Sequence, residues 1–208
     1  MSRKPVLNAT SSRLLPSERG FSLVEMLAVL AIVGLTAAIG VYSIDLAGWR
    51  CSSACSDIAR RLELARSRAI FEQNDYRIVF DTSAHTFQVH DDENSNGSID
   101  TDISEAVTTY YASTQGAGTV FGYPSGTKGI DGSNISAAIS FPGSPPVLTF
   151  DPLGSAVSGV IYLIPTADLD RSDPTHMRAI SVNQATGRVR RWRYDADVAN
   201  PGPWRLEQ

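Results

Sequence analysis

The chain has 208 residues, 42% of them hydrophobic, which allows one ordinary domain with a real core plus a membrane segment. The formal net charge of -4 at pH 7 excludes a uniformly basic nucleic-acid binder, although it allows a local basic patch. Two cysteines, Cys51 and Cys55, are too few for a disulfide scaffold, and their spacing is not the CxxC form of a redox or zinc site. On one helix they would be either two small packed residues or a disulfide at a distorted turn.

A basic N-terminal segment precedes a long apolar stretch. Residues 1–20 carry four basic residues against one acid. The stretch from Met26 to Ile44 carries no charge, and its length of about 19 residues spans a hydrocarbon core of roughly 30 Å. We therefore predict a transmembrane helix over residues 21–44, with the N-terminus in the cytoplasm because positive charge favours that side. No convincing secretory cleavage site follows the stretch, so we expect it to be retained.

The stretch RGFSLVE, residues 19–25, resembles the signature of type IV prepilins. This signature has a basic leader, a glycine before a hydrophobic residue, an acid five positions after that glycine, and an apolar span that follows at once. The resemblance implies that residues 1–20 are a leader, which a prepilin peptidase removes after Gly20 on the cytoplasmic side. The same enzyme would then methylate Phe21. It also implies an inner-membrane protein with a periplasmic C-terminal domain, whose N-terminal helix packs against those of other pilins or pseudopilins.

Glu25 is an acid at the head of this apolar stretch. An ionised carboxylate near the membrane core costs several kcal/mol unless it is paired. The cleavage implied by the resemblance creates a partner, the α-amine of Phe21 or of a neighbouring subunit, so Glu25 is predicted to set the register of assembly. Alternatively, Glu25 lies at headgroup depth, where a negative charge suits the helix dipole without a partner.

A second apolar pattern continues the helix beyond the predicted span. No proline or glycine occurs between Trp49 and Asn74, and one apolar stripe recurs at steps of four and three: Cys51, Cys55, Ile58, Leu62, Ala65 and Ala69. We predict one helix from about Phe21 to about Gln73, whose amphipathic part over 45–74 lies on a globular domain. Four arginines fall largely off the stripe and form either a solvated face or a site for an anionic partner: Arg60, Arg61, Arg66 and Arg68.

Residues 75–208 change to a β-rich composition with a period of two. Residues 76–81 and 86–91 flank a short turn as a predicted hairpin, and further strands are expected at 106–113, 147–151, 159–165, 179–183 and 188–194. We predict an α+β, pilin-like fold, in which the long N-terminal helix packs on an antiparallel β-sheet or small β-sandwich.

This order of elements resembles the GspH/FimT family of minor pseudopilins. The resemblance also rests on ELARSRAI at the end of the helix and on FDPLGSA and ATGRVRRW near the C-terminus. Where that family has an extended polar loop, this chain has residues 116–146, which are either a partner surface or a tolerated insertion.

The stretch DENSNGSID matches the early positions of an EF-hand-like calcium loop, with ligands expected from Asp92, Asn94, Asn96 and Asp100. The position of the bidentate glutamate holds Ile103 instead. A hairpin with Asn96 and Gly97 at its tip explains the same residues without metal. Apart from this calcium, no cofactor is expected.

The stretch GRVRRWRY interleaves aromatic residues with four arginines: Arg188, Arg190, Arg191 and Arg193. On a strand, the first two face one side with Trp192, and the last two face the other. Guanidinium groups bind phosphates and aromatic rings stack on bases, so duplex DNA is a candidate partner. The GRVR stretch also resembles the GRxR motif that FimT-type pilins use to bind DNA. The alternative is a C-terminal edge strand protected by charge, with arginines paired to acids such as Asp195 and Asp197.

Catalysis is not expected. The three histidines, His85, His90 and His176, show no metal-ligand spacing, and neither a nucleophile-elbow nor a phosphate-loop pattern occurs. Three hypotheses remain: a minor pseudopilin that initiates or caps a type II secretion pseudopilus, a type IV pilin that captures DNA for uptake, and a membrane-tethered protein that never joins a filament and keeps its leader.

Overall fold

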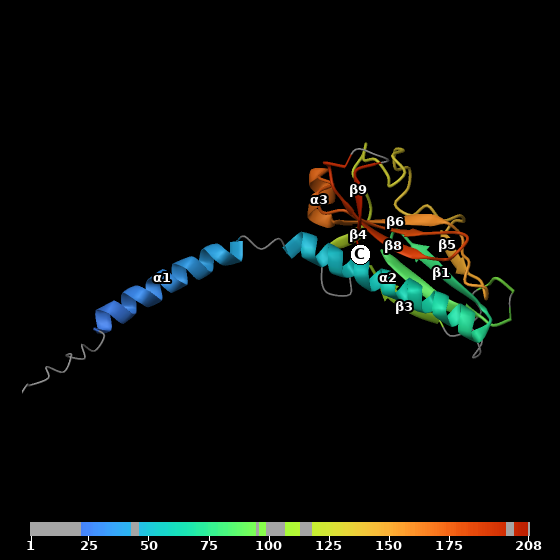
Figure 1. Cartoon of the computed structure of the whole chain (residues 1–208), viewed down its shortest axis with the longest axis horizontal. Helices are drawn as coiled ribbons and strands as arrows, with labels where there is room; N and C mark the ends of the chain where they lie inside the picture. The colour runs from blue at the N-terminus through green and yellow to red at the C-terminus, as the bar shows by residue number, and fades with distance from the viewer. Residues whose placement is uncertain are drawn as a thin grey trace, which may run out of the picture. The chain divides into compact units, whose positions relative to one another are not determined.

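The computed structural model describes residues 22–42, 46–94, 96–98, 107–112, 118–198 and 202–207, with side chains for all of these except 37–42. The chain forms two compact units, Met1–Ile44 and Asp45–Gln208 (Figure 1). The described part of the first unit is helix α1, and the second unit combines helices with two antiparallel sheets. The predicted α+β class is confirmed.

Helix α1 covers Leu23–Tyr42 and consists mainly of leucine, alanine, valine and isoleucine. Its first turn contains Glu25, whose charge suits the positive end of the helix dipole. The N–H of Met26 donates to the carbonyl of Ser22 at 3.1 Å, which closes the first turn. Among the helices that the structure describes, none is both long and apolar enough to cross a bilayer.

Helix α2 covers Leu46–Glu72 and buries one stripe of eight residues: Gly48, Cys51, Cys55, Ile58, Ala59, Leu62, Ala65 and Ala69. The stripe contains all six predicted residues, together with Gly48 and Ala59. The helix ends where Gln73 takes a left-handed φ of 58° and donates from its side-chain amide to the Ile70 carbonyl at 2.6 Å. One helix was predicted over 21–73, and the described residues of this range contain two helical segments, α1 and α2. Phe21 and residues 43–45, which complete that range, lie outside the described residues.

The first sheet has the strand order β3-β2-β1-β5. Its strands are β1 (Asp75–Asp81), β2 (Thr86–Asp92), β3 (Val107–Tyr111) and β5 (Val147–Phe150). The predicted β1–β2 hairpin is confirmed, and its register pairs Ile78 with Val89. Asp81 fixes the turn, because its Oδ1 accepts the N–H groups of Ser83 and Ala84, both at 2.9 Å.

The second sheet has the order β4-β6-β7-β8-β9. Its strands are β4 (Thr119–Phe121), β6 (Gly159–Pro165), β7 (Arg178–Val182), β8 (Val189–Tyr194) and β9 (Trp204–Glu207), and helix α3 (Thr166–Arg171) follows β6. The sequence predicted β6, β7 and β8. It did not predict β4, β9 or α3.

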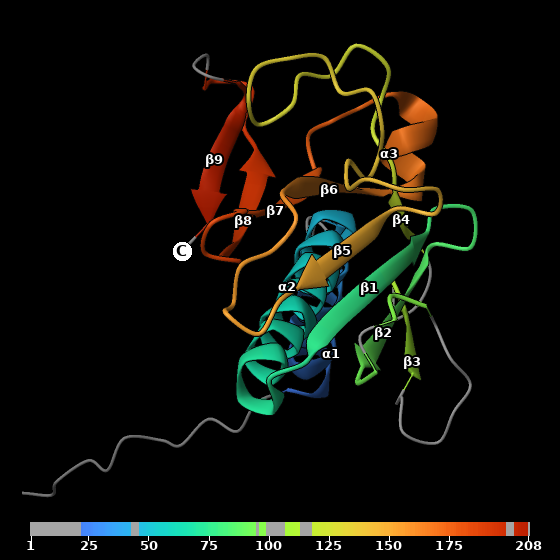
Figure 2. The ribbon, with the colours of Figure 1, turned by 90° about the vertical axis from the view of Figure 1, so that its right-hand side faces the viewer.

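Helix α2 packs against strands of both sheets, as Figure 2 shows, and the main core lies between them. Leu62 is 0% exposed, and burying such an aliphatic side chain contributes about 1.5–3 kcal/mol. Phe80 anchors an aromatic cluster, stacked on Phe141 at 5.6 Å between ring centroids and edge-on to Phe121 at 6.1 Å. The second unit therefore has a core of its own.

The segment predicted as a polar loop, residues 116–146, is partly packed structure. It contains β4, and its Ile130 and Ile135 pack on a second cluster that includes Tyr162 and Trp204. The indole N–H of Trp204 donates to the carbonyl of Lys128 at 2.8 Å. The described part of this segment thus contributes to both clusters, since Phe141 belongs to the main core and Ile130 and Ile135 pack on the second cluster.

Candidate functional site

The residues implied in processing and assembly lie at the start of the chain. Gly20 and Phe21 fall outside the described residues. Glu25 is described, and its side chain is exposed in the first turn of α1. Unpaired N–H groups give this end of a helix a partial positive charge. Glu25 is thus stabilised at this position without a charged partner, and its oxygens stay accessible to one.

Helix α1 exposes aliphatic side chains on every side. Nine of them are between 50% and 76% exposed: Leu23, Val24, Met26, Leu27, Val29, Leu30, Ile32, Val33 and Leu35. Helices that are apolar all round are buried, either inside larger assemblies or in a membrane. The described side chains of α1 therefore form an apolar surface that nothing in the described part of the first unit covers.

The arginine-rich stretch forms β8, which lies between β7 and β9. Trp192 pairs with Ala179 of β7 and with Leu206 of β9. The interpretation of this stretch as an edge strand is therefore wrong, because residues 204–207 form a further strand beside it.

The four arginines do not form one surface. Arg188 and Arg190 are exposed, as a DNA-binding role would need. Arg191 instead donates from Nη1 to the hydroxyl of Ser56 on α2. Arg193 is half-exposed, and its Nη2 lies 3.8 Å from a carboxylate oxygen of Asp195, so this predicted acid partner is confirmed.

A hollow and a held aromatic ring lie next to these arginines. A hollow of about 460 Å³ is lined by Glu63, Arg188, Val189, Arg190, Arg191, Leu206 and Glu207. The indole N–H of Trp192 donates to the Ser181 hydroxyl at 2.9 Å, so this ring is held against the sheet. The hollow thus combines three guanidinium groups and two carboxylates with aliphatic side chains.

A three-way contact that sequence reasoning missed holds the start of this stretch in place. We call it the clasp: Arg66 of α2, Gly154 and Gly187. The Nε of Arg66 donates to the Gly154 carbonyl at 3.0 Å. Gly187 has a φ of 57°, and a Cβ there would lie 2.3 Å from the Gly154 oxygen and 2.9 Å from Arg66 Nε. The glycines of FDPLGSA and ATGRVRRW are therefore needed for this close approach.

The predicted calcium loop begins at Asp92, which is 1% exposed. Its Oδ2 accepts the N–H of Gly97 at 2.9 Å and lies 3.9 Å from Nη1 of Arg77. Arg77 thus supplies a positive charge beside this carboxylate. Asp100 lies outside the described residues.

The two predicted asparagine ligands of this loop are held in local turns. The Oδ1 of Asn94 accepts the N–H of Asn96 at 2.9 Å, and the Oδ1 of Asn96 accepts that of Ser98 at 2.6 Å. Among the described residues, no three histidine, cysteine or acidic side chains come together as a metal site. Calcium binding stays a prediction.

The two cysteines lie side by side on the buried stripe of α2. Both are 0% exposed and neither forms a disulfide. The Sγ of Cys55 lies 4.0 Å from the carbonyl of Ala179 on β7. Burial raises the pKa of the Cys51 thiol to about 12. The prediction that they are packed residues is confirmed.

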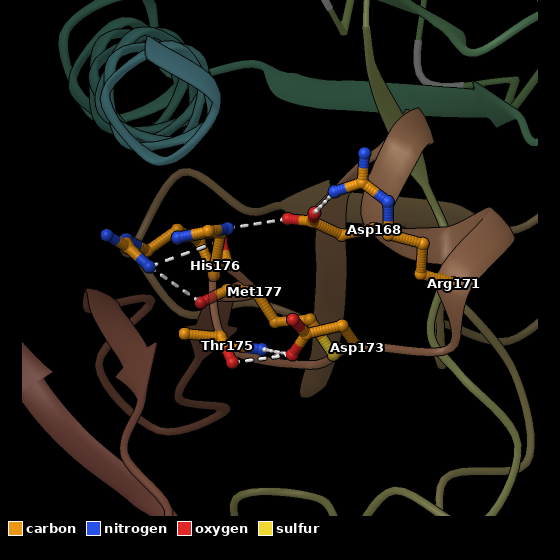
Figure 3. Close-up of polar contacts among 7 residues, drawn as sticks. Asp168, Arg171, Asp173, Thr175, His176 and Met177 are labelled. Carbon is orange, nitrogen blue, oxygen red and sulfur yellow. Dashed lines mark hydrogen bonds and ion pairs between the residues drawn. The ribbon is translucent and has the colours of Figure 1, made fainter. Parts of the chain in front are cut away.

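A buried acid joins α3 to the start of β7, as Figure 3 shows. Asp168 is 3% exposed, and its Oδ2 lies 2.6 Å from Nδ1 of His176. Nη1 of Arg171 lies 3.9 Å from the other oxygen. A single acid and a single histidine eight positions apart give no recognisable pattern, so the sequence did not reveal this pair. The contact between Asp168 and His176 holds the loop between α3 and β7.

Acidic side chains gather where α2 ends and β1 begins. The hydroxyl of Tyr76 donates to Glu72 and lies 3.3 Å from an oxygen of Asp91. Burial and these carboxylates raise the pKa of the Tyr76 hydroxyl. Burial, with Asp92 and Asp151 nearby, also raises the pKa of Asp75. These groups therefore titrate away from their ordinary ranges.

Solved structures offer three comparisons. The chain is similar to the minor pseudopilin EpsH from the type 2 secretion system of Vibrio cholerae, with 12% identity, a TM-score of 0.47 and coverage of 68% of this chain and 95% of that one. A second structure of that pseudopilin has 15% identity and a TM-score of 0.44, with coverage of 69% of this chain and 95% of that one. The type IV minor pilin FimU of Pseudomonas aeruginosa has 16% identity and a TM-score of 0.42, with coverage of 67% of this chain and 85% of that one.

Family models give a firmer result. No curated protein matches the sequence. The model of the prokaryotic N-terminal methylation motif matches residues 15–41, and that of type II transport protein GspH matches residues 54–187, more than half of the chain. The chain therefore belongs to the GspH family, the pilin-like structural subunits of type II secretion, which are not enzymes.

Proposed function

We propose that this chain is a minor pseudopilin that enters a type II secretion pseudopilus through α1, in the complex that initiates or tips the filament. Helix α1 carries the proposal, because its aliphatic side chains are exposed on all sides and its charge is confined to the first turn. The methylation motif, which covers the start of this helix, supports it.

Before assembly, residues 21–44 anchor the chain in the inner membrane, with the N-terminus in the cytoplasm and the globular unit in the periplasm. The prepilin peptidase cuts after Gly20 and methylates Phe21. Moving α1 from lipid to a bundle of pseudopilin helices exchanges one apolar surrounding for another, so packing and polar contacts decide the outcome. Glu25 supplies such a contact by pairing with the α-amine of Phe21 on a neighbouring subunit.

The test replaces Glu25 with alanine in the full chain, expressed in membranes that hold the secretion machinery. We expect leader removal to proceed as in the wild type, while recovery of the chain in sheared pseudopili falls at least tenfold, about 1.4 kcal/mol. Glu93→Ala, which removes an exposed acid of the globular unit, is the matched control. Wild-type recovery of the Glu25 variant would refute the assembly role. A wild-type chain that keeps its leader would instead support a tethered protein outside the filament.

DNA binding by a type IV minor pilin is the second candidate, favoured by the exposure of Arg188 and Arg190. If it operates, full-length protein binds duplex DNA, and affinity falls as salt rises because phosphate contacts release counterions. The double variant of these two arginines to alanine then loses binding, while Arg191→Ala changes little. Salt-independent binding, or equal binding by the double variant, argues against it.

A further inference from the structure

The clasp brings aliphatic and cationic side chains to one corner of the globular unit. Leu153 directly precedes Gly154 and is 91% exposed. Ile70 of α2 touches the same turn, since its Cδ1 lies 2.7 Å from where a Cβ on Gly154 would be, and it is 39% exposed. Arg188 directly follows Gly187 and is exposed. We name Ile70, Leu153, Arg188, Arg190 and Leu206 the basic-apolar corner.

Hydrogen bonds hold the backbone of the turn that carries Leu153. Asp151 Oδ1 accepts the N–H groups of Leu153 and Ser155, both at 2.9 Å, and the Asp151 carbonyl accepts the N–H of Gly154, also at 2.9 Å. Arg66 holds the Gly154 carbonyl from the other side. Leu153 is thus fixed in solvent by its backbone, and a partner that covers it loses little conformational entropy at this turn.

The hollow beside the clasp completes the surface. It is lined by Arg188 and Arg190 together with Leu206, which is 45% exposed. Glu63 and Glu207 also line it, but Glu207 pairs with Arg178, whose Nε lies 3.3 Å from Oε1. Glu63 is exposed at the α2 side of the hollow. The corner therefore combines two exposed guanidinium groups with aliphatic side chains, next to this one carboxylate.

This combination favours a protein over a nucleic acid. Phosphates would satisfy the arginines but leave Leu153 and Leu206 facing water. Carboxylates bind guanidinium groups in the same paired geometry, and an acidic protein segment can also bring aliphatic side chains to cover the leucines. We propose that the basic-apolar corner binds an acidic, amphipathic segment of a partner protein. The proposal goes beyond the filament role of α1, because every residue of the corner lies in the unit Asp45–Gln208.

The test measures fluorescence anisotropy of a labelled synthetic helical peptide, with leucines on one face and glutamates on the other. The protein is the full chain in nanodiscs, with empty nanodiscs as the blank. We expect about tenfold weaker binding for Leu153→Ser and for Arg188→Glu. The controls are Leu64→Ser and Arg60→Glu, which change exposed residues of α2 outside the basic-apolar corner. Both should bind the peptide as the wild type does.

Two comparison probes make the result decisive. A scrambled peptide of the same composition should bind at least tenfold more weakly, because it has no apolar face. Labelled duplex DNA tests the other source of negative charge. The proposal fails if neither peptide binds, if both bind equally, or if Leu153→Ser has no effect. It also fails if DNA binds more tightly than the peptide, with sensitivity to Arg188→Glu alone. Circular dichroism confirms that each variant is folded.

Discussion

Replacing Gly187 with alanine should destabilise the globular unit by about 3 kcal/mol. An L-residue at a left-handed φ, here 57°, costs roughly 1–2 kcal/mol. The new Cβ would also lie 2.3 Å from the Gly154 oxygen, so Arg66 and Gly154 must separate. Their hydrogen bond has a charged donor, and losing it in this half-buried place costs about 1.5 kcal/mol more.

Thermal unfolding of the full chain, followed by near-ultraviolet circular dichroism, measures this loss. For a unit of this size each 1 kcal/mol lowers Tm by roughly 2–4 °C, so we expect a fall of about 6–12 °C. Gly126→Ala is the matched control, because Gly126 has a φ of 79° with no atom within 4 Å of the added Cβ. It carries only the backbone cost, about 1–2 kcal/mol. Equal losses for the two variants would refute the clasp.

Three further predictions concern the core, titration and metal binding. Leu62→Ala should cost about 2–5 kcal/mol in urea unfolding because Leu62 is 0% exposed, whereas Leu64→Ala, at 52% exposed, should cost under about 1 kcal/mol. Because the pKa of Asp75 is raised in the folded state, ionisation of this carboxyl opposes folding. The stability that the protonated form contributes is present below the ordinary pKa of an aspartate, and it is lost as the pH rises through the raised pKa of the folded state. Asp75→Asn should therefore raise Tm relative to the wild type at pH 7 but not at pH 3, and a gain at both would contradict the assignment. A calcium site at Asp92 predicts a higher Tm in calcium than in chelator, and a larger difference in Arg77→Gln, which lacks the competing cation; no difference in either chain would rule it out.

Much of the fold follows from periodicity within single segments. Tyr76, Ile78 and Phe80 alternate with more exposed residues, and this alternation was enough to predict β1. The stripe of α2 was predictable for the same reason. Strand β9 was not, because it has only four residues after a Pro-Gly-Pro stretch and depends on pairing with β8. Helix α3 has six residues, too few to show a period.

The candidate sites likewise combine features that local periodicity predicts with features that only tertiary packing determines. The different surroundings of Arg190 and Arg191 follow from strand alternation, and the structure agrees, with one exposed and the other bonded to α2. The place of β8 inside the sheet depends on β9, so the sequence misjudged it. The clasp joins residues 66, 154 and 187, whose meeting is set by tertiary packing and not by any local pattern.

Because Cys51 and Cys55 are buried, their alkylation can report how often α2 separates from the sheet. Both thiols face the sheet side of α2, and burial raises their pKa, so an alkylating reagent finds neither access nor thiolate while the helix is docked. Labelling must wait for α2 to lift from β7. Its rate, measured by mass shift without any introduced probe, therefore counts these opening events, and comparison of free with assembled subunits would show how far neighbours suppress them.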